Sequence, residues 1–183
     1  MRKRLIFSLL MLTLPLLVQA QVVGNPSVEA SLPLGYEGFL FGQTLKEVKT
    51  LLESSTNLWW KGDPDVTMLA RPNTSLLEVD GAYYIKRAAF QFVEDGLYSI
   101  TLVMNEDKID YYSLFEQLNR KYGRPQLLNP QKAQWESSDT FLSLEKPMTV
   151  KYLNRPVLES LRQGVQTQSS QQRILREDFL GTL

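Results

Sequence analysis

The chain has 183 residues, no His and no Cys, and its 20 basic and 20 acidic side chains balance. The missing residue types exclude disulfide bonds, thiol nucleophiles, Ser-His-Asp triads, and zinc, copper or iron sites built on imidazole or thiolate ligands. Stability must therefore come from a hydrophobic core, and this length is enough for one domain or two very small ones.

The first 20 residues have the organisation of a cleaved export signal. The basic segment Arg2-Lys3-Arg4 precedes a largely apolar run over residues 5–18, and Val18-Gln19-Ala20 offers the small residues that a signal peptidase recognises. The run is shorter than the roughly 20 apolar residues that a membrane-spanning helix needs. We therefore predict cleavage after Ala20 and an exported product, periplasmic or secreted, without an integral membrane span.

Removal of residues 1–20 also changes the charge of the protein. It takes away three basic residues and no acidic ones, which leaves 17 basic against 20 acidic side chains and a net charge of −3. Nucleic-acid binding needs clustered Lys and Arg to neutralise phosphates, and no basic run follows the signal. We expect no nucleic acid among the partners.

After a linker at residues 21–35, two segments have helical periodicity. Thr44-Leu45-Lys46-Glu47 is a capping box, and the apolar residues after it share one face of a helix predicted over 44–54. A second helix is predicted over 108–121, followed by Gly123 as a C-terminal cap. Its apolar stripe consists of Tyr111, Leu114, Phe115, Leu118 and Tyr122.

Residues 82–93 and 97–104 alternate between apolar and polar side chains, and Asp95-Gly96 between them is a strong hairpin signal. We expect a core face on the first strand, with Lys86 as its exception and Ile85 on the opposite face together with Arg87 and Gln91. The residues expected on the core face of the two strands are Tyr84, Ala88, Phe90, Phe92, Tyr98, Ile100, Leu102 and Met104.

Shorter strands are predicted at Trp59-Trp60 and at residues 66–69, 134–135, 140–144 and 149–153. Each half of the chain thus carries an amphipathic helix, a strand with Trp and then hairpin strands. This similarity is typical of a degenerate repeat, although many α+β domains produce it. The predicted fold is α+β: two amphipathic helices packed on a largely antiparallel sheet within one domain at 36–155.

Aromatic side chains on that sheet suggest a surface for a partner. Tyr83 and Tyr84 are adjacent on one strand and must point to opposite faces, so at least one lies off the core face. Tyr and Trp are frequent interface anchors because they bury a ring and keep a polar end. The candidate residues are Trp59, Trp60, Tyr83, Tyr84 and Arg87; the alternative is core packing for the rings and a place at the sheet margin for Arg87.

Residues 156–183 are predicted to form a flexible tail. The stretch 163–172 is rich in Gln and Ser and cannot bury enough apolar surface to fold alone. Apolar residues return near the end and can dock on a partner as one amphipathic turn or two, the alternative being a frayed terminus. They are Ile174, Leu175, Phe179 and Leu180.

Other site chemistries have weaker sequence support. Asp63 with Asp65, and the acidic turn at residues 106–110, do not match the spacing of an EF-hand calcium loop. Trp59, Trp60 and Trp135 can stack on sugar rings, with or without a glycosidase carboxylate pair, but core packing is the commoner role of Trp in a small domain. We predict no catalytic residue, no metal and no cofactor.

Two segments resemble a known family. Gly42-Gln43-Thr44-Leu45-Lys46-Glu47-Val48 resembles the Gly-x-Thr-x-x-x-Val opening of the small bacterial envelope modules of the BamE (SmpA/OmlA) type, and residues 89–97 are similar to their strand-Asp/Gly-strand segment. The resemblance implies helices packed on a three-stranded antiparallel sheet, and a role in outer-membrane protein assembly rather than catalysis.

The function expected from these observations is non-catalytic. We predict an exported module that binds another envelope protein, as an assembly or structural accessory, through a sheet edge or aromatic groove and the C-terminal tail. The alternative is a periplasmic carrier or sensor with a small-ligand pocket between helices and sheet. A closed apolar cavity would favour the carrier, and a filled core with exposed aromatic residues would favour the protein partner.

Overall fold

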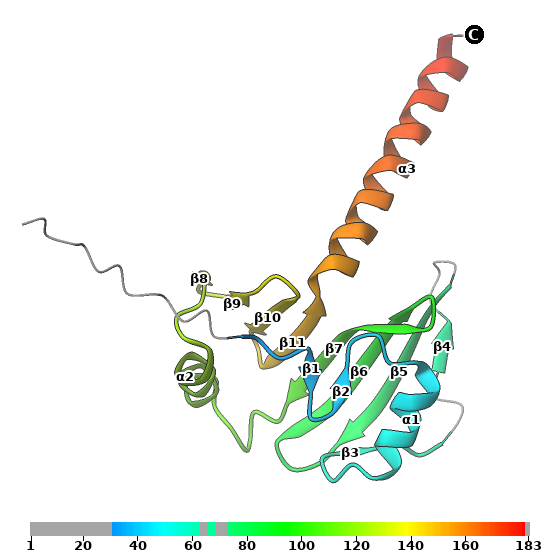
Figure 1. Cartoon of the computed structure of the whole chain (residues 1–183). Coiled ribbons are helices and arrows are strands. Elements are labelled where there is room, and N and C mark those ends of the chain that lie inside the picture. Colours follow the sequence, from blue (N-terminus) through cyan, green and yellow to red (C-terminus); the bar gives the residue numbers. More distant parts are fainter. Residues whose placement is uncertain (1–30, 63–65, 69–72, 182–183) are drawn as a thin grey trace, which may run out of the picture.

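The computed structural model describes residues 31–62, 66–68 and 73–181, and within them lie three helices and two antiparallel sheets (Figure 1). The acidic pair Asp63 and Asp65 falls outside the described residues, as does the export signal. The helices are α1 (Leu45–Glu53), α2 (Tyr111–Tyr122) and α3 (Arg155–Gly181). The small sheet pairs β1 (Gly35–Tyr36) with β2 (Phe39–Leu40).

The large sheet has nine strands in the order β3-β5-β6-β7-β11-β10-β9-β8, with β4 also paired to β5. Two successive meanders build it, and their last strands, β7 and β11, pair at the centre. The predicted α+β class and largely antiparallel sheet are therefore confirmed. The strands are β3 (Leu58–Trp59), β4 (Val66–Met68), β5 (Thr74–Gly81), β6 (Ile85–Val93), β7 (Gly96–Met104), β8 (Leu127–Asn129), β9 (Lys132–Glu136), β10 (Thr140–Glu145) and β11 (Thr149–Asn154).

The predicted cap of the first helix is confirmed. The Thr44 hydroxyl accepts from the Glu47 backbone N–H at 3.3 Å, and the Glu47 carboxylate accepts from the Thr44 backbone N–H at 2.7 Å. These bonds satisfy backbone donors that the first turn leaves free. The helix then places Val48 and Leu52 in the core with almost no exposed surface.

The second helix also begins and ends with local signals. Asp110 caps its N-terminus by accepting from the Ser113 backbone N–H at 2.9 Å, and Gly123 follows its last residue with a positive φ of 77°. Its Leu118 belongs to the core, and the ring of Phe115 lies 6.2 Å from that of Trp135. Helix α2 therefore covers β9 and β10 of the second meander.

The hairpin of β6 and β7 is confirmed, but two bulges change the predicted faces. Lys86 is an extra residue opposite β7, so Ile85 turns into the core instead of away from it, and the expected core residue Tyr84 lies exposed before the strand. Tyr98 is an extra residue in β7 and therefore does not point to the core face. Its hydroxyl donates to Gln91 Oε1 at 3.0 Å. A bulge shifts the two-residue alternation by one, which the periodicity alone does not show.

The tight turn of this hairpin lies one residue earlier than predicted. Glu94 and Asp95 are its central residues, both with positive φ, whereas Gly96 already pairs with Val93. The shift lets the Asp95 carboxylate accept from the Leu45 backbone N–H at 3.3 Å at the start of α1. The two sequence segments singled out for their family resemblance thus contact one another.

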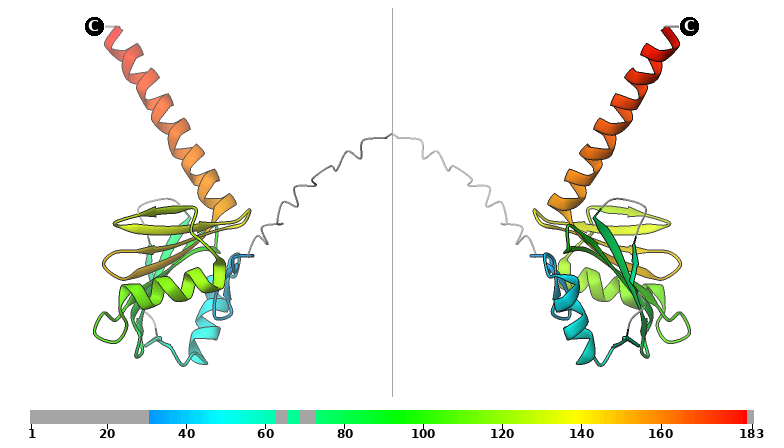
Figure 2. Two further views of the ribbon diagram at one scale, coloured as in Figure 1. Left: turned by 90° about the vertical axis from the view of Figure 1, so that its left-hand side faces the viewer. Right: turned by 90° about the vertical axis from the view of Figure 1, so that its right-hand side faces the viewer.

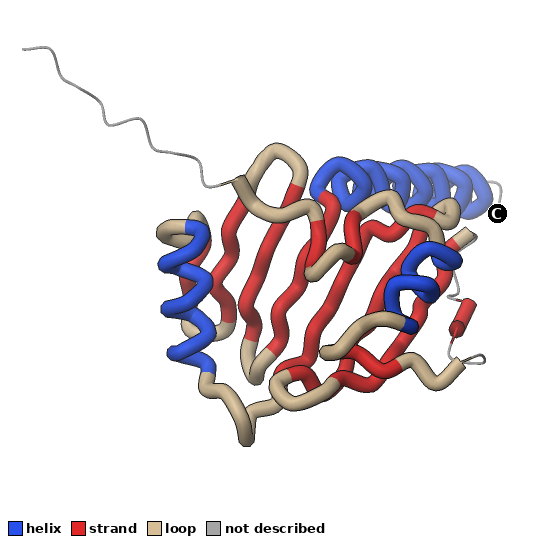
Figure 3. The backbone as a smooth tube through the Cα atoms, turned by 60° about the horizontal axis from the view of Figure 1, so that its bottom comes forward, coloured by secondary structure: helices blue, strands red, loops and turns tan. Residues whose placement is uncertain are grey.

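One hydrophobic cluster connects both meanders. It extends from Val48 and Phe90 in the first half to Trp135 and Leu142 in the second. Figure 2 shows α1 and α2 on one side of the large sheet and α3 leaving from the other, and Figure 3 shows α1 and α2 over different ends of the sheet. We call the face away from α1 and α2 the open face.

The folded domain begins earlier than the predicted boundary at residue 36. Leu32 is buried in the core, and the carbonyl of Pro33 accepts from the Thr140 hydroxyl at 3.0 Å. At the other end, the predicted flexible tail is helical: α3 continues the chain directly from β11 and extends away from the domain (Figure 1). Gln and Ser do not prevent a helix here, because their cost per residue is small.

Candidate binding surfaces

The candidate residues of the sequence divide between two separate places. Trp59 and Arg87 lie together at the β3 end of the sheet, whereas Leu175, Phe179 and Leu180 lie near the far end of α3 (Figure 1). Ile174 belongs to the same helix. The structure therefore brings two of the predicted sheet residues into one site and separates them from the C-terminal group.

Trp59 and Arg87 line a small surface cavity of about 210 Å³, which we call the Trp59 notch. Its other lining residues are Lys61, Glu78, Val79 and Asp80. Strand register explains the gathering, because Trp59 pairs with Asp80 and Asp80 pairs with Arg87 across three neighbouring strands. Residues directly opposite in a ladder share a face, so the three side chains stand in a row on the open face.

The charges of the Trp59 notch balance. Lys61 Nζ forms an ion pair with the Asp80 carboxylate. Arg87 and Glu78 have no hydrogen bond or ion pair with another described residue. The notch therefore presents the Lys61–Asp80 ion pair and the separate charges of Arg87 and Glu78 beside the indole of Trp59. The Trp59 side chain is 60% exposed.

The other two tryptophans lie on the core side. Trp60 packs partly buried against the core with Lys49 Nζ 5.2 Å from the centre of its ring, and its indole N–H is buried without a hydrogen-bond acceptor. Trp135 is 1% exposed, and its indole N–H donates to the carbonyl of Gly123 at 2.7 Å. Trp60, which follows β3, is thus only partly exposed and lies on the core side, in contrast to the exposed Trp59.

Tyr83 and Tyr84 are both exposed, at the connection between β5 and β6. Tyr83 is 82% exposed and has a φ of 49°, a conformation that costs energy for an aromatic residue. Asn105 holds the connection in place, donating from its side chain to the carbonyl of Tyr83 at 3.2 Å and from its backbone to that of Tyr84 at 2.8 Å. An exposed aromatic residue kept in a strained conformation marks a candidate contact.

The outer half of α3 presents the second candidate surface. Leu175 is 68% and Phe179 is 62% exposed, and Val165 and Leu180 are also exposed. Leu175 and Phe179 are four residues apart and therefore lie on the same side of the helix. We call residues 165–181 the arm.

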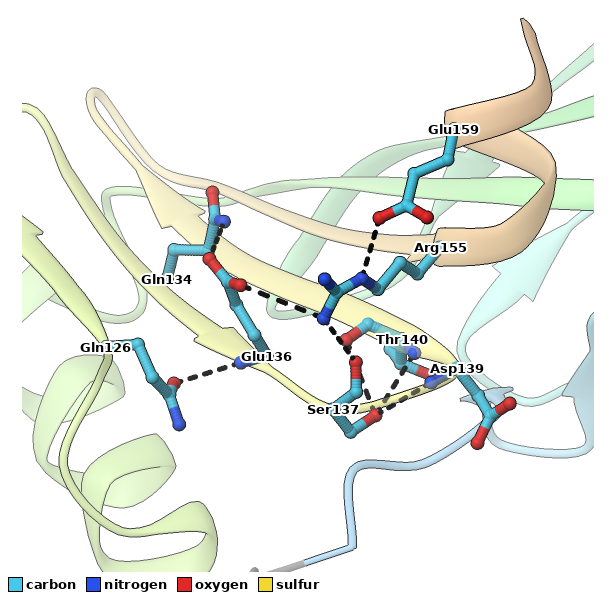
Figure 4. Close-up of polar contacts among 8 residues, drawn as sticks. All are labelled: Gln126, Gln134, Glu136, Ser137, Asp139, Thr140, Arg155 and Glu159. Carbon is cyan, nitrogen blue, oxygen red and sulfur yellow. Dashed lines mark hydrogen bonds and ion pairs between the residues drawn. The ribbon is translucent and has the colours of Figure 1, made fainter. Parts of the chain in front are cut away.

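The base of α3 is fixed by a set of contacts that the sequence did not indicate (Figure 4). Arg155 Nη1 donates to the carbonyl of Ser137 at 3.0 Å, Nε donates to Glu159 at 2.8 Å, and Glu136 lies 4.0 Å from the guanidinium. The guanidinium also lies 5.0 Å from the ring centre of Phe141. Arg155 was missed because a single Arg at the end of the predicted domain gives no pattern.

A further group of ion pairs crosses the open face. Glu145 lies between Lys132, at 3.5 Å, and Lys151, and also accepts from the hydroxyl of Ser143 at 3.1 Å. Partial burial by itself raises the pKa of Glu145, but the bond and charge of Lys151, followed by Ser143 and Lys132, outweigh it and lower the pKa. Such pairing stabilises a carboxylate and gives no sign of acid or base catalysis.

The remaining shifted groups also have structural causes. The pKa of Glu47 is lowered by its bonds with Thr44, and that of Asp110 by its bonds with Ser113, as expected of helix caps. Burial raises the pKa of Tyr152 in the core, and the charge interaction with Tyr122 adds to it. No group of three or more Asp or Glu side chains suited to a metal ion occurs among the described residues.

None of the three helices in the described part of the chain is both long enough and apolar enough to cross a bilayer. No curated protein and no solved structure matches the chain. The pattern that defines the TP0088 domain family matches residues 34–164. This range begins just before β1 and ends at Gly164, within α3. Because the match covers well over half of the sequence, the chain belongs to the TP0088 domain family.

Proposed function

We propose that this protein is an exported, non-catalytic module that binds another protein of the cell envelope and acts there as an assembly or structural accessory. The observation that carries the proposal is the arm, a helical segment whose Val165, Leu175, Phe179 and Leu180 are exposed. Exposed apolar groups gathered on one element are typical of a surface that a partner covers.

The energetics of an isolated helix support this proposal. In water a helix gains most of its stability from packing an apolar face, and Gly164, Ser169 and Ser170 are weak helix formers. An amphipathic helix that lays anchors four residues apart into an apolar groove is a common mode of peptide recognition. We therefore assign the arm to a groove on the partner, with Leu175 and Phe179 as the anchors.

The two edges of the large sheet favour this assignment over strand addition. The edge strand β8 has three residues, and Pro125 and Pro130 lie close to its two ends. At the opposite edge β3 has two residues and β4, which also pairs with β5, has three. Short strands beside prolines leave few backbone groups with which another chain can pair.

The alternative function, a carrier with a pocket between helices and sheet, fits the packing less well. Val48 of α1, Phe90 of β6 and Trp135 of β9 fill that space and are almost fully buried. The cavity of about 560 Å³ beside α1 is lined by outward residues such as Gln43, Lys46 and Thr50 and opens to solvent. Ligand pockets are usually more deeply enclosed.

We also propose that the two meanders, each preceded by its helix, derive from one repeated unit. The order of elements supports this, because α1 precedes β3, β5, β6 and β7 just as α2 precedes β8, β9, β10 and β11. The antiparallel pairing of β7 with β11, the last strands of the two meanders, is what a twofold relation between two repeated units would produce. One helix packed on each half of the sheet completes the proposed arrangement.

Capture of a partner tests the function. The full-length gene is expressed in its own host, envelope fractions are crosslinked, and proteins bound to the chain are compared with those bound to a chain ending at Gly164. This end point keeps Arg155 and the half-buried Leu158 and Leu161, so only the arm is lost. We expect a stoichiometric partner that depends on the arm.

A point variant separates docking from helix length. Leu175→Glu with Phe179→Glu should abolish capture, whereas Glu177→Gln, on the same helix, should not. Equal capture by all of these chains would overturn the assignment of the arm. Sequencing the N-terminus of the exported product tests the predicted cleavage, which should expose Gln21.

A further inference from the structure

The Trp59 notch lies on the first meander, whereas the arm that we assign to a protein partner leaves from the second (Figure 1). Its composition differs from that of the arm, since four of its six lining residues are charged. The notch therefore calls for a ligand of its own, in addition to the protein partner that the proposed function assigns to the arm.

We propose that the Trp59 notch binds one sugar ring of a neutral oligosaccharide. The exposed indole of Trp59 supplies a flat surface with a negative face, against which the weakly positive C–H groups of a pyranose ring can stack. The cavity of about 210 Å³ is smaller than the roughly 300–1,000 Å³ of pockets for drug-sized ligands, which suits a single ring of a longer chain.

The polar groups of the notch match sugar hydroxyls. Each hydroxyl both donates and accepts a hydrogen bond, and the notch offers a donor in Arg87 and an acceptor in Glu78. Neither has a hydrogen bond or ion pair with another described residue, so both are available without breaking an existing contact. Asp80 is already paired with Lys61, which fixes it beside the ring of Trp59.

The charge balance excludes the main competing ligands. Lys61 and Arg87 are matched by Glu78 and Asp80, so the notch carries no net charge with which to attract a phosphate or a nucleic acid. Four charged side chains around a small opening also make it a poor site for an apolar group, because Arg87 and Glu78 would lose hydration without gaining a partner. A neutral ligand rich in hydroxyl groups needs no net charge in the notch and supplies hydrogen-bond partners to its charged side chains.

The three tryptophans provide a direct measurement. In a proton–nitrogen NMR spectrum the chain should give three indole N–H signals, which Trp59→Phe and Trp60→Phe assign. The exported full chain is titrated with chitotetraose, cellotetraose and maltotetraose up to about 10 mM, because single-ring sites often bind with Kd on the order of 1 mM. We expect at least one of these probes to shift the signal of Trp59 and to leave those of Trp60 and Trp135 in place.

Variants then locate the contact. Trp59→Ala, Arg87→Met and Glu78→Gln should each raise Kd about tenfold or more, while Tyr112→Ala, an exposed aromatic on α2, should not change it. The proposal is overturned if no probe shifts the Trp59 signal, or if binding persists in Trp59→Ala. Because the arm is intact in all these chains, capture of the protein partner is measured on the same samples and fails or succeeds independently.

Discussion

At the scale of single residues, three tryptophans of one chain have three different roles. Trp135 fills the core beneath α2, Trp60 packs against the core with Lys49 over its ring, and Trp59 is exposed on the open face. The sequence placed Trp59 and Trp60 together as candidates because residue type alone does not tell which side of a strand a ring takes. The register of β3 against β5 decides it.

This difference predicts opposite effects of the same substitution. Trp135→Ala removes a fully buried ring and should lower the free energy of unfolding by about 3–5 kcal/mol. Trp59→Ala should change it by no more than about 0.5 kcal/mol, because the ring is mostly in solvent. Urea unfolding followed by circular dichroism measures both; Trp135→Phe is the fallback if the alanine variant does not fold. Similar losses for positions 59 and 135 would contradict the assigned burial.

Glu145 gives a prediction about pH. Its pKa is lower in the folded chain than in the unfolded one, so its contribution to stability is present above the unfolded pKa and disappears as the pH falls through the folded pKa. Glu145→Gln should therefore be less stable than the parent chain at neutral pH, and the gap should close at acidic pH. Denaturant unfolding of both chains from pH 7 to pH 3 measures this difference in the free energy of unfolding. A difference that does not change with pH would show that the ionised carboxylate of Glu145 is not its cause.

At the scale of elements, the sequence predicted most where the signals are local. Thr44 with Glu47 located the start of α1, and Gly123 located the end of α2. The faces of β6 and β7 were partly wrong, because Lys86 and Tyr98 form bulges that depend on pairing with the neighbouring strand. The contact of Asp95 with α1, fifty residues away, likewise has no local signal.

The connection between β5 and β6 is expected to be strained. Asn adopts a positive φ more easily than Tyr, so Tyr83→Asn should raise the free energy of unfolding by about 1 kcal/mol. Tyr84→Asn is the control, since Tyr84 is exposed in the same connection without a positive φ. Thermal unfolding of both variants decides the matter. A destabilised Tyr83→Asn would mean that the ring makes contacts that outweigh the strain.

The first turns of α3 should depend on Arg155. Arg155→Ala removes the bonds to Ser137 and Glu159, and a loss of about 1 kcal/mol would make backbone amides near residues 158–162 exchange hydrogen about five times faster. Arg162→Ala, a change of another Arg on the same helix, should leave exchange unchanged. Hydrogen exchange followed by mass spectrometry compares them. Unaltered exchange in Arg155→Ala would show that the apolar contacts alone hold the helix.

At the scale of the whole molecule, the arrangement joins a packed domain to a protruding helix. The domain is held by one core that runs through both meanders, and none of the arm's described side chains belongs to that core. The sequence predicted a flexible tail over residues 156–183, where the structure has α3. The reason is physical: the Gln- and Ser-rich stretch lacks the periodic apolar residues by which an amphipathic helix is recognised, although these residue types cost a helix little.

The order of strands was the largest feature beyond the reach of sequence patterns. Similar halves suggested a repeat, but the pairing of β7 with β11 joins strands about fifty residues apart, and only the tertiary structure defines it. The Trp59 notch lies on the open face at the β3 end of the large sheet, and α3 begins after the central strand β11. Two distinct surfaces thus follow from one topology.

The most direct test of the proposed function is crosslinking from a single position on the arm. A photo-reactive phenylalanine analogue replaces Phe179 in the full chain, expressed in its own host. The control chain carries the analogue at Glu177, which lies on a different side of the same helix. We predict one dominant crosslinked protein from position 179 and little from position 177. Equal, diffuse labelling from both positions would show that the arm remains in solvent, and would contradict the account.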